Sequence, residues 1–312
     1  MAFVKAYGRY LPQRIVDNRE IGALIGAEPS WIEQVSGIAE RRFAADGESV
    51  VDMAEKAAQS CLASVAMAAS DIGMIIVASG TGPRRFPGPA AGVAHRLGVL
   101  GIPALDVPMA SAGSIFGLCL AAELAPRYGN MLVVASEKLS DIVLRSPIEA
   151  GTAALFGDGA GACLISSNTG TAEILDFTLC SDGSFSEDLC LGFEGPLLMN
   201  GRSVILQASR KIPRAIQQAL DRTGIQAEKV TAFLMHQANQ NLLDRVARAV
   251  GVPAARFYSN IRRFGNTSSA SMLIAASEWN ENARIQSGET VVFAGFGAGF
   301  HWGALVARGV LG

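Results

Sequence analysis

The sequence predicts an α/β protein whose two halves repeat one another. Half of its 312 residues are apolar and only 17% are charged, which provides material for a large buried core. Short apolar runs of strand length alternate with segments of helix length, as expected for stacked α/β layers. The same order of elements occurs a second time along the chain, which indicates an internal duplication.

The composition also argues against nucleic acids and membranes as partners. The formal net charge is −2 and the sequence has no basic cluster, which argues against a nucleic-acid partner. No apolar run reaches the roughly 18–20 residues needed to span a bilayer, and the first residues lack a signal-peptide pattern. We therefore expect a cytoplasmic protein with no membrane partner. The scattered cysteines are expected to be buried free thiols: Cys61, Cys119, Cys163, Cys180 and Cys190.

The elements of the first half follow from apolar runs and turn signals. Strands are predicted at 3–9, 73–79, 103–107, 130–136 and 160–166. Helices are predicted at 30–37, 49–69 and 111–126, with another through 95–97 after a loop rich in Gly, Pro and Arg at 81–89.

The second half repeats this order. Its predicted elements are a strand at 231–235, a helix at 239–250, a strand at 256–259, a helix at 266–282, and strands at 290–294 and 302–308. The last strand of each half follows a glycine-rich run, FGDGAG in the first and FGAGF in the second. We expect an N-terminal half at 1–168 and a C-terminal half at 169–312. Loops and short strands near an entrance are expected at 168–204.

One strand-to-helix turn, LDVPMASAGSIFGL at 105–118, is the best place for a nucleophile. Its strand stops at Pro108, and the helix is expected to begin with Ser111. The free N–H groups at a helix start favour developing negative charge there. On these residues alone, Ser111 is either a nucleophile or merely an N-cap.

The duplication adds two further polar groups. The helix expected from Asn266 is the counterpart of the one expected from Ser111, so both should begin near the same region. The strand ending at 235 delivers His236 at its carboxyl end, where α/β proteins usually carry their chemistry. A serine, a histidine and an amide that converge suit acyl transfer. Serine would attack a thioester, histidine would assist, and backbone N–H groups would hold the oxyanion.

Other chemistries have weaker signals. FGDGAG does not fit the dinucleotide fingerprint and is interpreted as a tight turn, with Asp158 bonded to local backbone. The sequence has no phosphate-binding loop of the G-x-x-x-x-G-K-[ST] type, no C-x-x-C and no H-E-x-x-H. We therefore expect neither a metal nor a nucleotide-dependent reaction.

The chain resembles the β-ketoacyl-acyl-carrier-protein synthase III family of thiolase-like condensing enzymes over essentially its whole length. The matching stretches are AYGRYLPQRIVDN, SWIEQVSGIAERR, RFPGPAA, DVPMASAG, LFGDGAGA, SDGS, HQAN, FGNTSSAS and FGAGFHWGA. The resemblance implies a five-layered αβαβα fold and a homodimer. It also implies acyl transfer from a coenzyme A thioester, followed by decarboxylative condensation with malonyl-acyl carrier protein. No tightly bound cofactor is implied.

The resemblance also assigns roles. His236 and Asn266 match the pair that hydrogen-bonds the malonyl thioester oxygen. The N–H groups of Ser111 and Ala298 match the oxyanion hole. The residues expected to bind substrate are Trp31, stacked on the adenine; Phe86, reaching across the dimer to the partner's acyl pocket; and Asn239 of HQAN.

The chain departs from the family pattern at four positions. Ser111 stands where the nucleophilic cysteine is expected, and Ala150, Val35 and Asn241 stand where cations are expected. Fewer cations should weaken recognition of the coenzyme A phosphates. Cations that could meet an acidic carrier protein, or form only a solvated helix face, are Arg210, Lys211, Arg214, Arg245 and Arg248.

Three functions therefore stay open. The first is an acyltransferase of fatty-acid or polyketide biosynthesis that uses Ser111 as acyl acceptor. The second is a weakened pseudo-synthase, or an engineered Cys→Ser form, that binds acyl groups or a partner subunit. The third is a hydrolase that uses Ser111 and His236, in which Asn266 would have no evident role.

Overall fold

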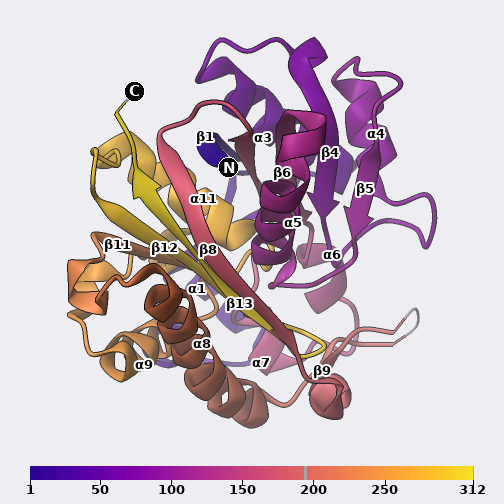
Figure 1. Ribbon diagram of the computed structural model, residues 1–312. Coiled ribbons are helices and arrows are strands. Elements are labelled where there is room, and N and C mark those ends of the chain that lie inside the picture. The colour runs from indigo at the N-terminus through magenta and orange to yellow at the C-terminus, as the bar shows by residue number, and fades with distance from the viewer. Residues whose placement is uncertain (193–194, 312) are drawn as a thin grey trace.

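The computed structural model describes residues 1–192 and 195–311, which form one large mixed β-sheet covered by helices (Figure 1). The described strands of this sheet lie in the order β11-β12-β13-β8-β1-β7-β6-β4-β5. Their bounds are β1 (Phe3–Tyr10), β4 (Ile72–Ala78), β5 (Ala104–Val107), β6 (Asn130–Glu137), β7 (Gly159–Ser166), β8 (Ala172–Ser181), β11 (Ala232–Met235), β12 (Thr290–Gly297) and β13 (His301–Gly309).

The strand order confirms the duplication. The halves meet where β1 pairs with β8, through Phe3 opposite Glu173 and Val4 opposite Ala172. Outward from that junction, β1-β7-β6-β4 corresponds to β8-β13-β12-β11. The directions match as well, because the first two pairings of each half are antiparallel and the third is parallel.

The fifth strand of the second half is reduced to a single pair of residues. The prediction of a strand at 256–259 is wrong. This part of the chain forms a 3₁₀ turn, η4 (Ala254–Arg256), followed by one parallel bridge between Phe233 and Phe257. The two phenyl rings stack with centroids 4.5 Å apart. This bridge takes the place that the parallel pairing of β5 with β4 has in the first half.

Helices cover both faces of each half-sheet and give five layers. The main ones are α3 (Val50–Ala63), α4 (Pro89–Arg96), α5 (Gly113–Tyr128), α8 (Gly201–Thr223), α9 (Gln240–Val250) and α11 (Ala270–Asn282). Helices α3 and α4 pack on the first half, and α8 packs on the second with α9 beside it. Helices α5 and α11 contact strands of both halves, so they form the middle layer.

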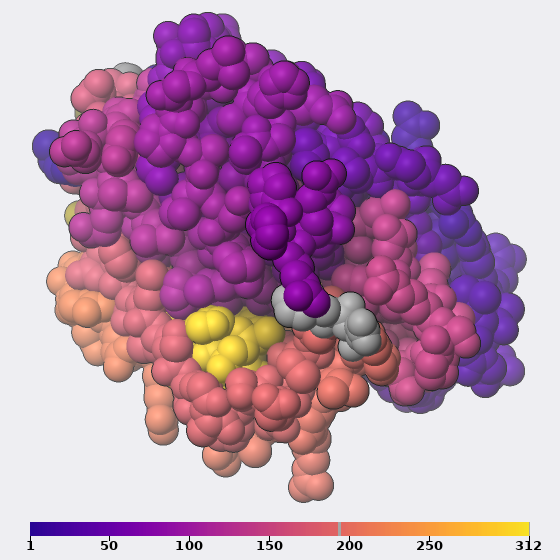
Figure 2. All heavy atoms as spheres, turned by 90° about the vertical axis from the view of Figure 1, so that its right-hand side faces the viewer, coloured from indigo at the N-terminus to yellow at the C-terminus, as the bar shows by residue number. Residues whose placement is uncertain are grey.

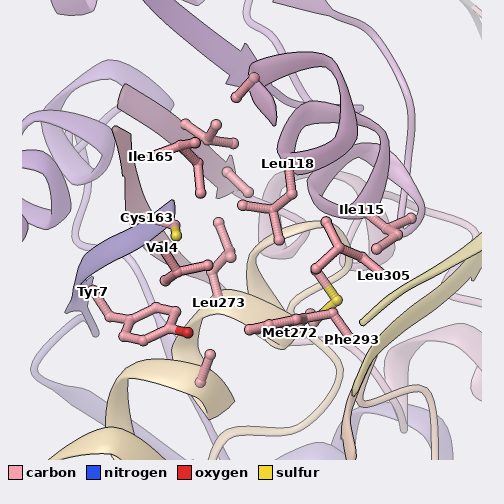
Figure 3. Close-up of a cluster of buried hydrophobic side chains, with 14 of the residues drawn as sticks. Val4, Tyr7, Ile115, Leu118, Cys163, Ile165, Met272, Leu273, Phe293 and Leu305 are labelled. Atoms are coloured by element: carbon pink, nitrogen blue, oxygen red, sulfur yellow. The ribbon is translucent and has the colours of Figure 1, made fainter. Parts of the chain in front are cut away.

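The middle layer is the centre of the core. All residues of α11 from Ala270 to Trp279 are buried, as expected for a helix with sheets on both sides. Figure 3 shows side chains of α5 and α11 packed among strand residues from both halves. Those labelled there are Val4, Tyr7, Ile115, Leu118, Cys163, Ile165, Met272, Leu273, Phe293 and Leu305.

Both central helices begin later than the sequence suggests. They start at Gly113 and Ala270, because the polar residues before each one adopt a turn with a left-handed residue. These residues are Ser111, with φ of 64°, and Ser268, with φ of 48°. The helix predicted at 49–69 ends at Ala63, and Ser49 caps its start in a capping box with Asp52.

The segment expected to hold loops and short strands, 168–204, also contains the long strand β8. Most residues of β8 are partly buried on both faces of the strand. The regular alternation of buried and exposed side chains that identifies a half-buried strand is therefore missing. The smaller elements of the chain are β2 (Arg14–Asp17), α1 (Asn18–Ile25), α2 (Pro29–Ser36), β3 (Glu40–Phe43), η1 (Ala69–Asp71), α6 (Ser140–Val143), α7 (Ala150–Ala153), η2 (Gly183–Asp188), β9 (Leu189–Cys190), β10 (Leu198–Met199), η3 (Ala227–Lys229) and α10 (Ile261–Phe264).

Two smaller expectations need correction. The carboxylate of Asp158 does not bond local backbone; it accepts hydrogen bonds from the N–H groups of Ala44 and Ser140, at 2.8 and 2.9 Å. It therefore ties distant loops together. Three cysteine thiols are buried as expected, but Cys180 and Cys190 are only partly buried. Among the described residues, no helix is long and apolar enough to cross a membrane.

Candidate active site

Ser111 lies in a strained turn between β5 and α5. The N–H of Ala112 bonds back to the carbonyl of Ala110 at 2.7 Å, and the positive φ of Ser111 costs about 1–3 kcal/mol for a residue other than glycine. The helix N-cap is Ala112, so the interpretation of Ser111 as the N-cap is wrong. A Cβ on Gly297 would lie 2.0 Å from the carbonyl oxygen of Ala110, so the β12–β13 loop packs directly on this turn.

Ser111 opens into a cavity of about 130 Å³ between the two halves. The described residues that line it include no Asp, Glu, Lys or Arg, and most of its wall is apolar. The predicted residues that it brings together are Ser111, His236, Asn239, Asn266 and Ala298. Within the described chain, no cluster of His, Cys, Asp or Glu side chains could hold a metal ion.

His236 is buried at the carboxyl end of β11. Its backbone N–H continues the parallel pairing by bonding to the carbonyl of Ala294 at 2.9 Å. The Nδ1 atom lies 2.6 Å from the hydroxyl oxygen of Ser271. Because burial removes the charged form from water, the pKa of His236 falls to about 4. The imidazole is therefore neutral near pH 7 and suited to hydrogen bonding.

Asn266 has its side chain fixed at both ends. Its Oδ1 accepts a hydrogen bond from the N–H of Ser268 at 2.8 Å, and its Nδ2 donates to the carbonyl of Ala238 at 3.3 Å. A carboxamide nitrogen has two hydrogens, so one remains to donate to a substrate. Asn239 lines the same cavity while its Oδ1 caps helix α9 through the N–H of Leu242.

Two predicted substrate-binding residues are not among the described residues that line the cavity. Trp31 lies on α2 with 43% of its surface exposed, and Phe86 lies in the loop before α4 with 84% exposed. This loop, purple in Figure 2, stands out from the surface as an arm. Such exposed aromatic side chains are available to a ligand or to another chain.

Ser268 is a cavity residue that the sequence interpretation missed. The backbone N–H of Ser111 donates to its hydroxyl oxygen at 2.8 Å, and the two hydroxyl oxygens are 3.3 Å apart. The N–H assigned to the oxyanion hole is therefore already bonded within the chain. The run of hydroxyls in NTSSAS was the available signal, but only the tertiary structure shows which of them meets Ser111.

A fully buried carboxylate, Glu137, lies behind these serines. Its Oε2 accepts hydrogen bonds from the N–H of Gly80 at 3.0 Å and the hydroxyl of Thr81 at 2.7 Å, and its Oε1 accepts from the N–H of Ser269 at 3.3 Å. Burial raises the pKa of Glu137, while its hydrogen bonds and the nearby hydroxyl of Ser268 oppose this increase.

The positions that lack the expected cations lie on three different helices. Val35 is on α2, Ala150 begins α7, and Asn241 is on α9. The side-chain amide of Asn241 donates to the carbonyl of Val35 at 3.1 Å, which joins α9 to α2. Nearby, Arg262 is paired with Glu33 at 2.7 Å. A neutral hydrogen bond thus joins α9 to α2, and the arginine of α10 that contacts α2 is neutralised by Glu33.

The comparisons with known proteins agree with this architecture. Residues 105–183 match the family model described as 3-oxoacyl-[acyl-carrier-protein] synthase III, and residues 220–308 match the model for its C-terminal part. A β-ketoacyl-[acyl-carrier-protein] synthase III of Staphylococcus haemolyticus is 34% identical over 308 residues, and one of Staphylococcus saprophyticus is 36% identical over 308 residues. Each alignment covers 98% of both chains.

Solved structures extend the similarity to the whole fold. The 3-oxoacyl-[acyl-carrier-protein] synthase III of Aquifex aeolicus superposes with a TM-score of 0.94 at 30% identity, covering 99% of this chain and 100% of that one. The priming β-ketosynthase of the R1128 polyketide biosynthetic pathway gives a TM-score of 0.91 at 28% identity, covering 99% and 96% of the two chains. The chain therefore belongs to the β-ketoacyl-acyl-carrier-protein synthase III family and has the family's thiolase-like αβαβα fold.

Proposed function

We propose that this protein is a condensing acyltransferase of fatty-acid or polyketide biosynthesis that carries its acyl group on Ser111. The observation that carries the proposal is the meeting of Ser111, His236 and Asn266 in one uncharged, largely apolar cavity. The names of its relatives support a carrier-protein substrate. Such a cavity suits a neutral acyl chain and the neutral arm that bears the thioester.

In the loading step, the Ser111 oxygen attacks the thioester carbonyl. A C–O bond forms, the C–S bond breaks, and the thiol leaves with the proton that the serine gives up. The N–H of Ala298 and the amino-terminal end of α5 are the groups proposed to favour the negative oxygen. The N–H of Ser111, which the resemblance also assigns to this hole, donates to the hydroxyl of Ser268 at 2.8 Å.

In the condensation step, a malonyl thioester loses carbon dioxide and its thioester oxygen gains negative charge. Neutral His236 and the free hydrogen of the Asn266 amide are proposed to donate to that oxygen. For this, the imidazole carries its hydrogen on Nε2 and its Nδ1 accepts from the hydroxyl of Ser271. The resulting carbanion attacks the acyl ester on Ser111, a C–C bond forms, and the serine oxygen leaves and takes back a proton. An ester is a poorer acyl donor than a thioester, so this step should be slower than with cysteine.

We propose acyl-CoA and acyl carrier protein as the thioester donors. Trp31 is proposed to stack on the adenine, although Val35, Ala150 and Asn241 leave the expected phosphate path with few cations. Binding of coenzyme A should then be weak. Four exposed arginines on α8 and α9 are proposed to meet the acidic carrier protein: Arg210, Arg214, Arg245 and Arg248. Lys211 instead pairs with Asp182 at 2.6 Å.

We further propose a homodimer in which Phe86 reaches the partner's acyl pocket, as the resemblance implies; Phe86 is 84% exposed, so burial of the phenyl ring there would be favourable. The cytoplasm is the proposed compartment, which suits five free cysteines. The division into halves at 1–168 and 169–312 stays a proposal about domain organisation.

A binding or assembly role is the second candidate. It is favoured by Ser111, whose hydroxyl lacks the acidity of a thiol. A protein of this kind would hold an acyl chain, or pair with an active relative, without turning over by itself.

Intact-mass measurement distinguishes these functions. The protein is incubated with a panel of acyl-CoA and acyl-carrier-protein donors, with Ser111→Ala as the matched control. An acyl adduct that maps to Ser111 and then disappears on addition of malonyl-acyl carrier protein, with formation of the 3-oxoacyl product, supports the condensing function. If no donor gives an adduct that depends on Ser111, the covalent role is wrong and the binding role is favoured.

A further inference from the structure

Ser111 needs a base that the family resemblance does not provide. A serine hydroxyl stays protonated near neutral pH and must lose its proton as it attacks. His236 is committed through Nδ1 to Ser271 and is assigned to the condensation step. The structure holds another buried chain of polar groups that starts at Ser111 itself.

The first link is the hydroxyl of Ser268. A hydroxyl oxygen accepts two hydrogen bonds and donates one. The backbone N–H of Ser111 can only donate, so its 2.8 Å contact fills one acceptor site of the Ser268 oxygen. The Ser111 hydroxyl, 3.3 Å away, fills the second when it donates. The hydrogen of Ser268 is then left to donate to a third group.

The third group is the carboxylate of Glu137. This side chain is fully buried, and its Oε1 accepts a hydrogen bond at 3.3 Å from the N–H of Ser269, the residue after Ser268, which brings the Ser268 hydroxyl beside the carboxylate. Both carboxylate oxygens also accept from backbone N–H groups, Oε2 from Gly80 and Oε1 from Ser269. Because an N–H can only donate, this arrangement suits the ionised, proton-accepting form of the carboxyl group. Burial raises its pKa, which makes it a stronger base than an exposed glutamate.

We propose that Ser111, Ser268 and Glu137 form a proton relay that activates Ser111 for acyl loading, an inference that rests on the proposed function. As the Ser111 oxygen bonds to the thioester carbon, its proton moves to the Ser268 oxygen and the Ser268 proton moves to Glu137. The C–S bond then breaks, and the proton returns along the same path to the leaving thiolate. The N–H of Ser111, aimed at the Ser268 oxygen, stabilises the negative charge that develops there during the transfer.

The arrangement depends on four separated segments. Glu137 ends β6, Gly80 and Thr81 follow β4, Ser111 follows β5, and Ser268 and Ser269 precede α11. The strands β4, β5 and β6 are parallel, so their carboxyl ends meet at one edge of the sheet. The second half adds the serines that connect the carboxylate to the nucleophile.

The test measures single-turnover acylation of Ser111 by butyryl-N-acetylcysteamine, using intact mass. Glu137→Gln keeps the shape and removes the base, and Ser268→Ala removes the link. Each is expected to slow loading by about 100-fold or more, the usual size of general base catalysis. The control is Glu123→Gln, an exposed glutamate on α5, which should load at the parent rate. The solvent deuterium isotope effect on loading should be present in the parent and lost in both relay variants.

Repeating the Glu137→Gln substitution in a protein that also carries Ser111→Cys separates the relay from a merely structural role. A thiol at a helix start forms a thiolate without this base. Adding Ser111→Cys to Glu137→Gln should therefore restore loading to within about threefold of Ser111→Cys alone, with melting temperatures measured for every variant. Failure of this rescue in folded protein would overturn the relay. If Glu137→Gln does not fold, the same comparison is made with Ser268→Ala.

The outcomes also separate the relay from the function on which it rests. Equal loading rates in the parent and in Glu137→Gln would reject the relay and leave Ser111 as the acyl acceptor. No adduct in the parent with any donor, while Ser111→Cys loads normally, would reject both.

Discussion

The Nδ1 atom of His236 lies 2.6 Å from the hydroxyl oxygen of Ser271, at the start of the central helix α11. The same hydroxyl accepts a hydrogen bond from the N–H of Gln237 at 3.0 Å and lies 2.9 Å from the carbonyl of Ser268. This serine thus orients the imidazole while its oxygen accepts from the backbone of Gln237. A histidine that must present its other nitrogen to a substrate needs such an anchor.

Removing this anchor with Ser271→Ala should impair condensation more than loading. The imidazole loses its orienting partner, so we expect the condensation rate to fall by about tenfold, while the rate of Ser111 acylation changes less than about threefold. The buried N–H of Gln237 also loses its acceptor, which should cost about 1–3 kcal/mol of unfolding free energy. Rapid-quench assays of the two half-reactions and urea unfolding measure these effects. Ser271→Thr keeps the hydroxyl and should restore the condensation rate. Equal slowing of both half-reactions would contradict the assigned role of His236.

Replacing the nucleophile by Ser111→Cys should increase condensing activity by about tenfold or more, equivalent to a barrier about 1.4 kcal/mol lower. The physical reasons are the lower pKa of a thiol at a helix start and the greater reactivity of a thioester intermediate. Steady-state product formation from acyl-CoA and malonyl-acyl carrier protein measures the change. An unchanged rate would place the limitation in substrate recognition, at Ala150, Val35 and Asn241.

The buried state of His236 predicts a pH-dependent stability. Its pKa is about 4 in the folded protein and about 6.5 when unfolded, so between these values the unfolded chain binds more protons. The stabilising contribution is complete above pH 6.5 and is lost as the pH falls toward 4. It amounts to about 2 kcal/mol between pH 7.5 and pH 5. Urea unfolding of the parent and of His236→Gln at both pH values isolates this effect, since other titrating groups are shared. The parent should lose about 2 kcal/mol more than the variant. Equal losses would show that His236 does not titrate abnormally.

Asp158→Ala should destabilise the fold strongly. The substitution leaves three buried donors without an acceptor, namely the N–H of Ala44 and both the N–H and the hydroxyl of Ser140. We expect a loss of about 3 kcal/mol or more in unfolding free energy. The nearby control is Asp141→Ala, whose carboxylate is 58% exposed and pairs with Lys138 at the surface, so its loss should stay below about 1 kcal/mol. Similar losses for the two variants, measured by urea unfolding, would contradict the structural role of Asp158.

Four of the exposed arginines of α8 and α9 should increase the affinity for carrier protein in a salt-dependent way: Arg210, Arg214, Arg245 and Arg248. Reversing two of them in the double variant Arg210→Glu with Arg214→Glu should raise the KM for malonyl-acyl carrier protein by about tenfold and leave the KM for acyl-N-acetylcysteamine unchanged. The difference should shrink at high ionic strength, since exposed charges are screened. Steady-state kinetics at low and high salt measure this. The matched control is Arg308→Glu. Arg308 is an exposed arginine near the end of β13, on neither α8 nor α9. Equal KM values for the parent and the double variant would favour a merely solvated helix face.

The sequence by itself determined the fold class, the duplication and three residues that meet in the cavity. Strong apolar runs and helix periodicity depend only on the local order of side chains. They can therefore be recognised without knowledge of the tertiary contacts. Ser111, His236 and Asn266 follow from that duplicated order, because equivalent elements end in the same region. The exact element ends at Gly113 and Ala270 did not follow, since left-handed turns at Ser111 and Ser268 are imposed by packing.

The tertiary structure alone decided which polar groups surround the nucleophile. Ser111 and Ser268 are separated by 157 positions, and Glu137 and Ser269 by 132, yet each pair is joined by a hydrogen bond. No local pattern distinguishes a buried glutamate at a strand end from an exposed one. Its hydrogen-bond partners come from both halves: the N–H of Gly80 belongs to the first half and the N–H of Ser269 to the second. The position of Ser269 depends on how the two half-sheets enclose α5 and α11. Local sequence therefore placed Ser111 in the cavity, and long-range packing placed a hydroxyl and a carboxylate behind it.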